Sequence, residues 1–99
     1  MTTSEIVRDA RVHIVDDQPA NIVLLERLLR RHGVRHIKST SDARMMLSDF
    51  AQFRPDIVLL DLHMPYLDGF ALLGHLKTLT PATAYLPILV LTADASSEA

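Results

Sequence analysis

The order of apolar and polar positions predicts four strands separated by three helices. Short runs rich in β-branched and apolar residues, typical of strands, occur at 11–15, 34–39, 56–61 and 86–92. The run at 34–39 alternates apolar and polar residues, which indicates an edge or half-exposed strand, whereas 56–61 and 86–92 are apolar almost throughout. Continuous apolar strands are typical of a parallel sheet that is covered on both faces.

The three segments between these strands have apolar residues at helical spacing and residues typical of helix ends. After the first strand, Pro19 suits a first helical turn, Arg30 and Arg31 suit a last turn, and Gly33 suits the position just after the helix. The second helix is expected to be capped by Ser41 and ended by Pro55. Its apolar positions follow the helical repeat, at Ala43, Met46, Leu47 and Phe50.

The third helix begins after the turn-forming pair Asp68-Gly69, with Asp68 as its cap. Leucines at 72, 73, 76 and 79 give it an apolar stripe, and Pro81 ends it. The resulting β-α-β-α-β-α-β order predicts an α/β fold with parallel strands and right-handed crossovers. We expect residues 1–10 to be a polar lead-in, frayed or a short helix, and residues 11–99 to be one domain.

Composition narrows the class of protein. The 99 residues suffice for one small domain, and the absence of cysteine excludes disulfides and cysteine-based metal sites. The net charge of −2 is too balanced for electrostatic binding of nucleic acid. There is no apolar run of membrane-spanning length and no signal peptide pattern at the N-terminus. The expected location is therefore the cytoplasm.

Polar side chains follow three of the predicted strands at their carboxyl ends. Asp16 and Asp17 follow the first strand, Asp61 ends the third and Thr92 ends the fourth. Ligands of open parallel sheets bind at this edge. Carboxylates placed together repel one another, and a divalent cation such as Mg²⁺, which prefers oxygen ligands, removes that repulsion. A carboxylate at such a site can also act as a nucleophile toward phosphorus.

Each of these residues could also have a purely structural role. An aspartate after a strand is usually a turn former or a helix cap, and the Asp16-Asp17 pair before Pro19 fits that role equally well. Thr92 alone would be structural. Asp61 is different, because a cap does not need so apolar a strand before it. The combination of all three strand ends favours a functional site.

Three motifs, in order, resemble the receiver domain of two-component response regulators. They are "HIVDDQPAN" at 13–21, "IVLLDLHMPYLDG" at 57–69 and "LPILVLTADA" at 86–95. The middle motif is long enough to be specific. The resemblance implies a protein of bacterial origin. It also implies a flavodoxin-like, doubly wound parallel sheet with strand order 2-1-3-4 and a fifth strand beyond the end of this sequence.

The resemblance also implies a role for each candidate residue. Asp61 is similar to the phosphoacceptor, Asp16 and Asp17 to the pair that holds Mg²⁺ (or Mn²⁺), and His63 to the position whose backbone carbonyl binds the metal. Thr92 is similar to the switch hydroxyl that turns toward the phosphoryl group. Ala93 is small enough to leave room for the phosphodonor.

The implied function is that of a phosphorylation-activated switch in a phosphorelay rather than an enzyme. Its phosphodonor would be a sensor histidine kinase or a phosphotransfer protein, for which small acyl phosphates often substitute. The domain itself is expected to contact neither membrane nor nucleic acid. An output domain in a longer chain and a homodimer are both compatible with the resemblance.

One departure from the family pattern leaves alternatives open. The fifth strand of the family carries a lysine that contacts the phosphoryl group, and here the lysines are Lys38, on the second strand, and Lys77, late in the third helix. We therefore expect either a fragment of a longer chain or a pseudo-receiver that binds partners without phosphorylation. A phosphohydrolase of the haloacid-dehalogenase type is disfavoured, because His63 stands where its second aspartate would be. Output domains that hydrolyse cyclic di-GMP or bind DNA also remain open.

Overall fold

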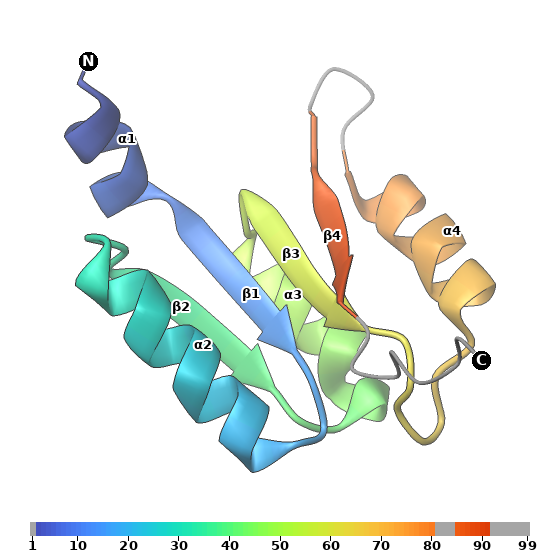
Figure 1. The fold of residues 1–99 in the computed structure, drawn as a ribbon. Coiled ribbons are helices and arrows are strands. Elements are labelled where there is room, and N and C mark those ends of the chain that lie inside the picture. Colours follow the sequence, from blue (N-terminus) through green and yellow to red (C-terminus); the bar gives the residue numbers. More distant parts are fainter. Residues whose placement is uncertain (1, 81–84, 92–99) are drawn as a thin grey trace, which may run out of the picture.

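The computed structural model describes residues 2–80 and 85–91, and its centre is a four-stranded parallel sheet (Figure 1). The spatial order is β2-β1-β3-β4, as the sequence predicts. The strands are β1 (Arg11–Val15), β2 (His36–Thr40), β3 (Ile57–Asp61) and β4 (Ile88–Leu91).

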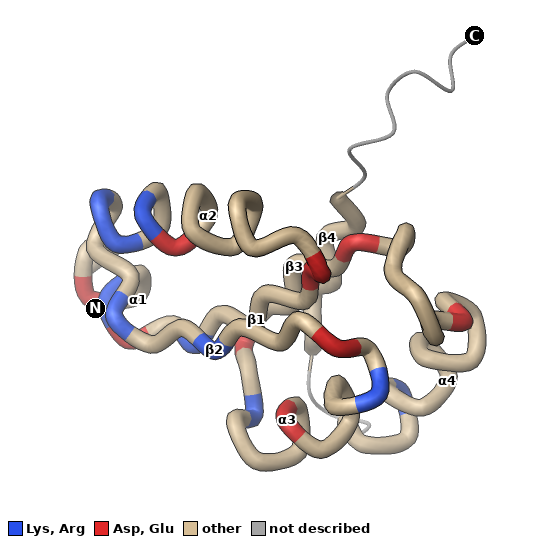
Figure 2. The backbone as a smooth tube through the Cα atoms, turned by 90° about the horizontal axis from the view of Figure 1, so that it is seen from below, with Lys and Arg blue, Asp and Glu red and all other residues tan. Residues whose placement is uncertain are grey.

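Helices cover both faces of this sheet. They are α1 (Thr3–Asp9), α2 (Pro19–Arg31), the 3₁₀ turn η1 (Ala43–Met45), α3 (Met46–Phe53) and α4 (Gly69–Leu79). Viewed along the sheet, α2 lies on one face, and α3 and α4 lie on the other (Figure 2). This two-sided cover is the arrangement that right-handed β-α-β crossovers produce when the strand order reverses direction.

Alternation along the central strands divides the core into two apolar clusters. Val12 and Ile14 of β1 face α2, together with Leu59 of β3. Val15 of β1 faces α3 and α4 with Leu60 of β3, and both side chains are fully buried. Each fully buried side chain of this kind contributes about 1.5–3 kcal/mol relative to an exposed one. The two clusters fix the register of the central strands, because a slip of one residue would exchange the faces.

The register places the carboxyl ends of β1, β2 and β3 side by side. Val15 pairs with Thr40 on one side and with Leu60 on the other. Asp16 and Asp61, which come one residue later on their strands, therefore project from the same edge of the sheet.

Helix ends agree with most of the sequence signals, with one correction. Gly33 follows the last turn of α2 with φ +97°, and Asp68 caps α4 by accepting a hydrogen bond from the Ala71 amide at 3.2 Å. The predicted cap at Ser41 is wrong. Asp42 caps instead, accepting from the Arg44 amide at 2.9 Å, and the chain makes the η1 turn before α3 begins. The Asp42 carboxylate also binds the Arg44 guanidinium at 2.8 Å, which favours Asp42 over Ser41 as the capping residue.

Two strands differ from their predictions in extent or burial. β2 begins at His36, because the Val34 amide instead donates to the Leu29 carbonyl and closes the end of α2. β4 was expected to be buried on both faces, but Leu89 and Val90 are about half exposed. β4 pairs on one side with β3 and lies at the edge of the sheet within the described residues. Pro81, the predicted end of the third helix, lies outside those residues.

The N-terminal segment forms a helix rather than a frayed end. Thr2 accepts a hydrogen bond from the Glu5 amide, and the Glu5 carboxylate accepts one from the Thr2 amide, at 3.1 and 3.0 Å. This reciprocal pair is a capping box, which satisfies two of the free amides at the start of α1. Val7 then packs against the apolar cluster beneath α2.

Gly33→Ala and Gly74→Ala form a matched pair with opposite expected effects. Gly33 holds φ +97°, and an added methyl would meet only Val7 Cγ1, at 3.9 Å, so the cost is backbone strain. We expect Gly33→Ala to lower the free energy of unfolding by about 1–2 kcal/mol. Gly74 lies inside α4 with no atom near the added methyl, and Gly74→Ala should raise stability by about 0.5–1 kcal/mol. Urea unfolding measures both, and a stabilising Gly33→Ala would contradict the backbone assignment.

Candidate functional site

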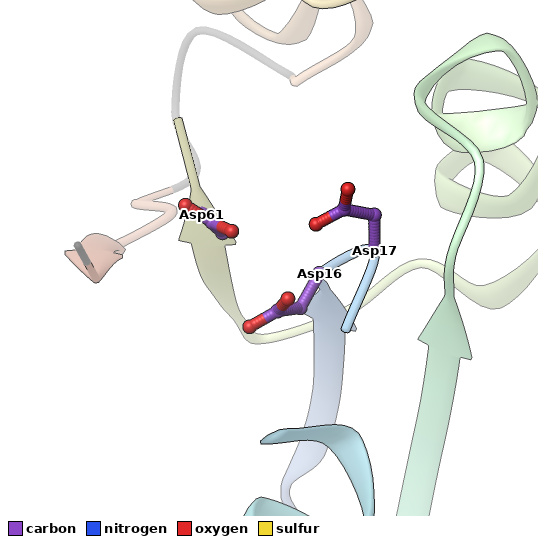
Figure 3. A group of neighbouring side chains, drawn as sticks. All are labelled: Asp16, Asp17 and Asp61. Carbon is purple, nitrogen blue, oxygen red and sulfur yellow. The ribbon is translucent and has the colours of Figure 1, made fainter. Parts of the chain in front are cut away.

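Three carboxylates gather where β1 and β3 end. Asp16, Asp17 and Asp61 each offer an oxygen, and these oxygens all lie within 4.8 Å of one another. Figure 3 shows the first two on the segment leaving β1 and the third at the tip of β3, with their side chains in the same space between the strands. The convergence predicted from the sequence for these three residues is thus present in the structure.

Asp16 is held by three hydrogen bonds, one at its backbone amide and two at its carboxylate. Its amide donates to the Thr40 carbonyl at 3.1 Å, which extends the pairing of β1 with β2 by one residue. Its Oδ1 accepts from the Gln18 amide at 2.9 Å, and its Oδ2 accepts from the Asn21 side-chain amide at 3.2 Å. Both oxygens of this buried carboxylate are therefore already engaged, and they start the turn into α2.

Asp17 has the opposite character. Its Oδ1 atom is buried and has no hydrogen-bond partner among residues 2–80 and 85–91. A buried polar atom without a partner is rare in native proteins and costly, and a bound cation would supply the partner that this oxygen lacks. The chemistry of this donor set, three carboxylates with oxygens within 4.8 Å of one another, fits a hard divalent cation. The residues present therefore suit Mg²⁺ or Mn²⁺.

Asp61 ends an apolar strand yet turns toward the acidic group. The residue is 7% exposed, and its Oδ1 accepts from the His63 backbone amide at 2.9 Å. Across the described part of the chain, Oδ2 accepts no protein hydrogen bond. One oxygen is thus fixed in place by the following turn while the other is available for chemistry. Pairing of Asp61 with Leu91 of β4 holds the strand tip from the other side.

The charge distribution around the site favours a cation. The acidic group lies at the start of α2, and the basic residues of that helix gather at its far end (Figure 2). Lys38 extends toward Asp49 of α3, with its Nζ 4.0 Å from Oδ1. Lys77 is exposed in the last turn of α4. The prediction that neither lysine serves the acidic site agrees with these positions.

Two predicted residues lie outside the described part of the chain, and two unpredicted residues join the site. Thr92 and Ala93 lie outside that part of the chain, so their roles stay predictions. Metal binding by the His63 carbonyl also stays a prediction. Asn21 and Thr40 both hold Asp16. The sequence carries a signal for Asn21, because it falls in the first turn of the helix that Pro19 opens. It carries none for Thr40, which reaches the site only through the register of β2.

Within the described ranges, no helix is both long and apolar enough to cross a membrane.

Comparison with known proteins gives consistent matches over nearly the whole chain. The sequence matches the family model of the response regulator receiver domain over residues 12–99. It is 35% identical over 94 residues to the sensory/regulatory protein RpfC of Xanthomonas campestris pv. campestris, and 31% identical over 94 residues to a probable cyclic di-GMP phosphodiesterase of Vibrio cholerae. These matches cover 94% and 95% of this chain but only 13% and 21% of the relatives.

A solved structure agrees with the fold. The N-terminal domain of a response regulator receiver protein from Methanoculleus marisnigri superposes with a TM-score of 0.73 at 32% identity, covering 87% of this chain and 68% of that one. The parallel α/β fold of this chain and its family match over residues 12–99 lead to the same assignment. The chain belongs to the response regulator receiver domain family, the phosphorylation-activated signalling switches of bacterial two-component systems.

Proposed function

We propose that Asp61 is the residue that accepts the phosphoryl group. The supporting observation is the different engagement of the three carboxylates: both oxygens of Asp16 accept hydrogen bonds, whereas Asp61 has one oxygen held by the His63 amide and the other free of protein donors within the described residues. A nucleophile needs a held side chain with one accessible lone pair. Asp61 meets both conditions at the tip of a rigid strand.

The divalent cation of this proposal is Mg²⁺ or Mn²⁺, held by Asp16, Asp17 and Asp61. The His63 backbone carbonyl would supply a further oxygen, and the engaged oxygens of Asp16 favour contact through water. When bound, the metal neutralises negative charge on the transferring phosphoryl group and on the carboxylates. The unpartnered Asp17 Oδ1 is the feature of this chain that supports such a site.

The protein's own part in the transfer is to present Asp61. Its Oδ2 forms a bond to phosphorus as the bond from phosphorus to the donor breaks, and the donor leaves with the bonding electron pair. For a phosphohistidine donor the leaving group is the imidazole, and for an acyl phosphate it is the carboxylate. The His63 amide holds Asp61 Oδ1 in place during this step, which limits the side chain to the attacking rotamer.

The phosphoryl group carries a charge of about −1.5 to −2 where the free carboxylate carried −1, so phosphorylation makes this edge of the sheet more negative by about one charge. We propose that the Thr92 hydroxyl, which follows β4 in the sequence, donates to the new phosphoryl oxygens and couples the charge to a conformational change. Within this proposal residues 11–99 act as the receiver and residues 1–10 as a lead-in that forms α1. The domain catalyses only its own phosphorylation and dephosphorylation, so it is a switch and not an enzyme in the ordinary sense.

The proposed partners are a sensor histidine kinase or phosphotransfer protein as donor and an output domain as recipient of the signal, in the cytoplasm. The chain covers only a small share of its relatives' length, so the output is a separate proposal. A cyclic di-GMP phosphodiesterase output has support from the name of the Vibrio cholerae relative. The pseudo-receiver alternative has less support, because the acids are grouped and Asp17 Oδ1 is unpartnered among the described residues.

Intact-protein mass spectrometry tests the proposed function. The protein is incubated with a small acyl phosphate, with and without Mg²⁺, and then treated with hydroxylamine, which cleaves acyl phosphates. We expect a gain of one phosphoryl group that requires the metal and is removed by hydroxylamine. A protein that gains no phosphoryl group from acyl phosphate or from a histidine phosphodonor would contradict the proposal and favour the pseudo-receiver.

Asp17→Asn is expected to weaken metal binding with little effect on folding. The amide is similar in size, but it removes one negative charge and one strong oxygen ligand. We expect the dissociation constant for Mn²⁺, measured by electron paramagnetic resonance of the free ion, to rise at least about tenfold. Asp9→Asn is the matched control, because Asp9 is an exposed carboxylate in α1, and α1 lies before the start of β1 whereas the acidic group follows the end of that strand (Figure 1). Equal affinity in both variants would argue against Asp17 as a ligand.

A further inference from the structure

A buried polar chain runs from α3 to the backbone that carries Asp16. The Thr40 hydroxyl donates to Asp49 Oδ2 of α3 at 2.7 Å and lies 2.7 Å from His13 Nε2 of β1. Thr40 is 3% exposed and His13 is completely buried. The carbonyl of the same threonine accepts the Asp16 amide at 3.1 Å. Thr40 is therefore tied to α3 and β1 by its side chain and to the acidic site by its backbone.

The number of hydrogen atoms available determines which groups donate in this hydrogen-bonded series. A hydroxyl has one hydrogen, and here it goes to the Asp49 carboxylate. His13 Nε2 must then carry the hydrogen that it shares with Thr40 Oγ1, so the tautomer of His13 is fixed. Burial lowers the pKa of His13 to about 4, with Asp49 raising it and Lys38 lowering it to a smaller extent. The imidazole thus stays neutral and acts as a steady donor to Thr40.

These hydrogen bonds hold the last residue of β2 at the edge of the sheet. Edge strands fray at their ends unless side chains hold them. Thr40 is the last residue of β2, which is an edge strand of the sheet formed by the described residues, yet its hydroxyl is engaged by groups on two other elements. A fraying of this end would release the Asp16 amide and change where its carboxylate lies.

We propose that Thr40, held by His13 and Asp49, is a positioning residue for the metal site and sets its affinity through the Asp16 backbone. This inference rests on the proposed function, because it concerns the same cation. It goes beyond that function in assigning a role to three residues that touch no reacting group. It also connects the position of α3 with the acidic site through two hydrogen bonds of Thr40. Its hydroxyl donates to Asp49 of α3, and its backbone carbonyl accepts from the Asp16 amide.

The test compares Thr40→Val, Thr40→Ser and Ser39→Ala, with Mn²⁺ as the probe. Valine keeps the shape of threonine but removes the hydroxyl, whereas serine keeps the hydroxyl. Ser39 is the preceding residue of β2. Its hydroxyl donates to Glu26 of α2 at 2.6 Å, and Glu26 is not part of the group formed by Asp16, Asp17 and Asp61. Affinity is measured at a temperature and urea concentration where all variants are folded, so that lost stability does not change the result.

We expect Thr40→Val to raise the Mn²⁺ dissociation constant about tenfold, the low end of the effect of outer-shell partners. Thr40→Ser should restore most of the affinity, and Ser39→Ala should lose stability while binding Mn²⁺ as the original protein does. Hydrogen exchange of the Asp16 amide should be faster in Thr40→Val alone. If Thr40→Val does not fold, Asp49→Ala carries the same test, because it removes the acceptor of the Thr40 hydroxyl.

The outcomes separate the inference from the proposed function. If the original protein binds Mn²⁺ and the hydroxyl-deleted variant binds it equally well, the positioning role is wrong and the metal site stands. If the original protein binds no Mn²⁺, both the metal site and the inference are contradicted. Reduced affinity in Ser39→Ala as large as in Thr40→Val would show a general effect of β2 stability and would overturn the specific role of Thr40.

Discussion

Asp61→Asn is expected to abolish phosphoryl uptake while leaving the fold intact. The amide nitrogen that replaces one carboxylate oxygen is not a nucleophile toward phosphorus, so the rate of uptake from acyl phosphate should fall by at least about a hundredfold, equal to about 2.7 kcal/mol of barrier. The remaining amide oxygen can still accept the His63 amide hydrogen, which Asp61 Oδ1 accepts now. The folded structure therefore loses no hydrogen bond that the site depends on.

Stability gives this variant an internal control. The change removes one of three mutually repelling carboxylates, so in the absence of metal the midpoint of urea unfolding should be equal to or higher than that of the original protein. Mass spectrometry of the phosphorylated protein measures uptake, and Asp9→Asn on α1 should take up phosphoryl groups normally. Undiminished uptake by Asp61→Asn would show that the nucleophile is a residue other than Asp61.

The second large effect is a loss of stability in mild acid caused by His13. Burial holds the pKa of His13 at about 4 in the folded protein, against 6.5 for the free side chain. Between these values the unfolded chain binds a proton that the folded protein does not, so stability falls as the pH is lowered from 6.5 to 4. Each pH unit contributes about 1.4 kcal/mol, for a total of about 3 kcal/mol. The loss ends near pH 4, where the folded form also binds the proton.

His13→Gln isolates this contribution from that of the carboxylates. Glutamine keeps an N–H donor for Thr40, but it loses the ring that packs against Phe53, so the variant should be less stable than the original protein at pH 7. Glutamine does not titrate in this range. The difference in free energy of unfolding should then shrink or reverse by about 3 kcal/mol as the pH falls to 4. His75→Gln, at an exposed position in α4, controls for the removal of a histidine as such. A difference between His13→Gln and the original protein that stays constant from pH 7 to pH 4 would contradict the neutral buried imidazole.

The expected acid sensitivity has its physical origin in the geometry around His13. Its Nδ1 atom is buried and has no partner among the described residues, and the ring of Phe53 lies edge-on to it with centroids 6.1 Å apart. A proton added at Nδ1 would place a charge where the described residues offer no hydrogen-bond acceptor. The same geometry that keeps the imidazole neutral therefore makes the core vulnerable to protonation.

Local sequence signals predicted the elements of this fold well where side chains act on their own backbone. Pro19, Gly33 and Asp68 start or end their helices as expected, since capping and ring constraints act within one turn. The cap at Ser41 was wrong, because two adjacent capping residues compete and the Arg44 guanidinium decides in favour of Asp42. β4 proved more exposed than its apolar sequence indicated. Hydropathy indicates which side chains prefer burial but does not say what covers them.

By itself, the sequence determined the α/β class, the parallel strand order implied by the family motifs, and the meeting of Asp16, Asp17 and Asp61. These follow from alternation and from the rule that parallel strands end at one edge. Only the tertiary structure decided which carboxylate oxygens are engaged: both of Asp16 and one of Asp61 accept hydrogen bonds, while Asp17 Oδ1 has no partner among the described residues. It also brought together three side chains from β1, β2 and α3, those of His13, Thr40 and Asp49. Such contacts depend on register and helix packing, which bring together residues far apart in sequence and leave no local pattern.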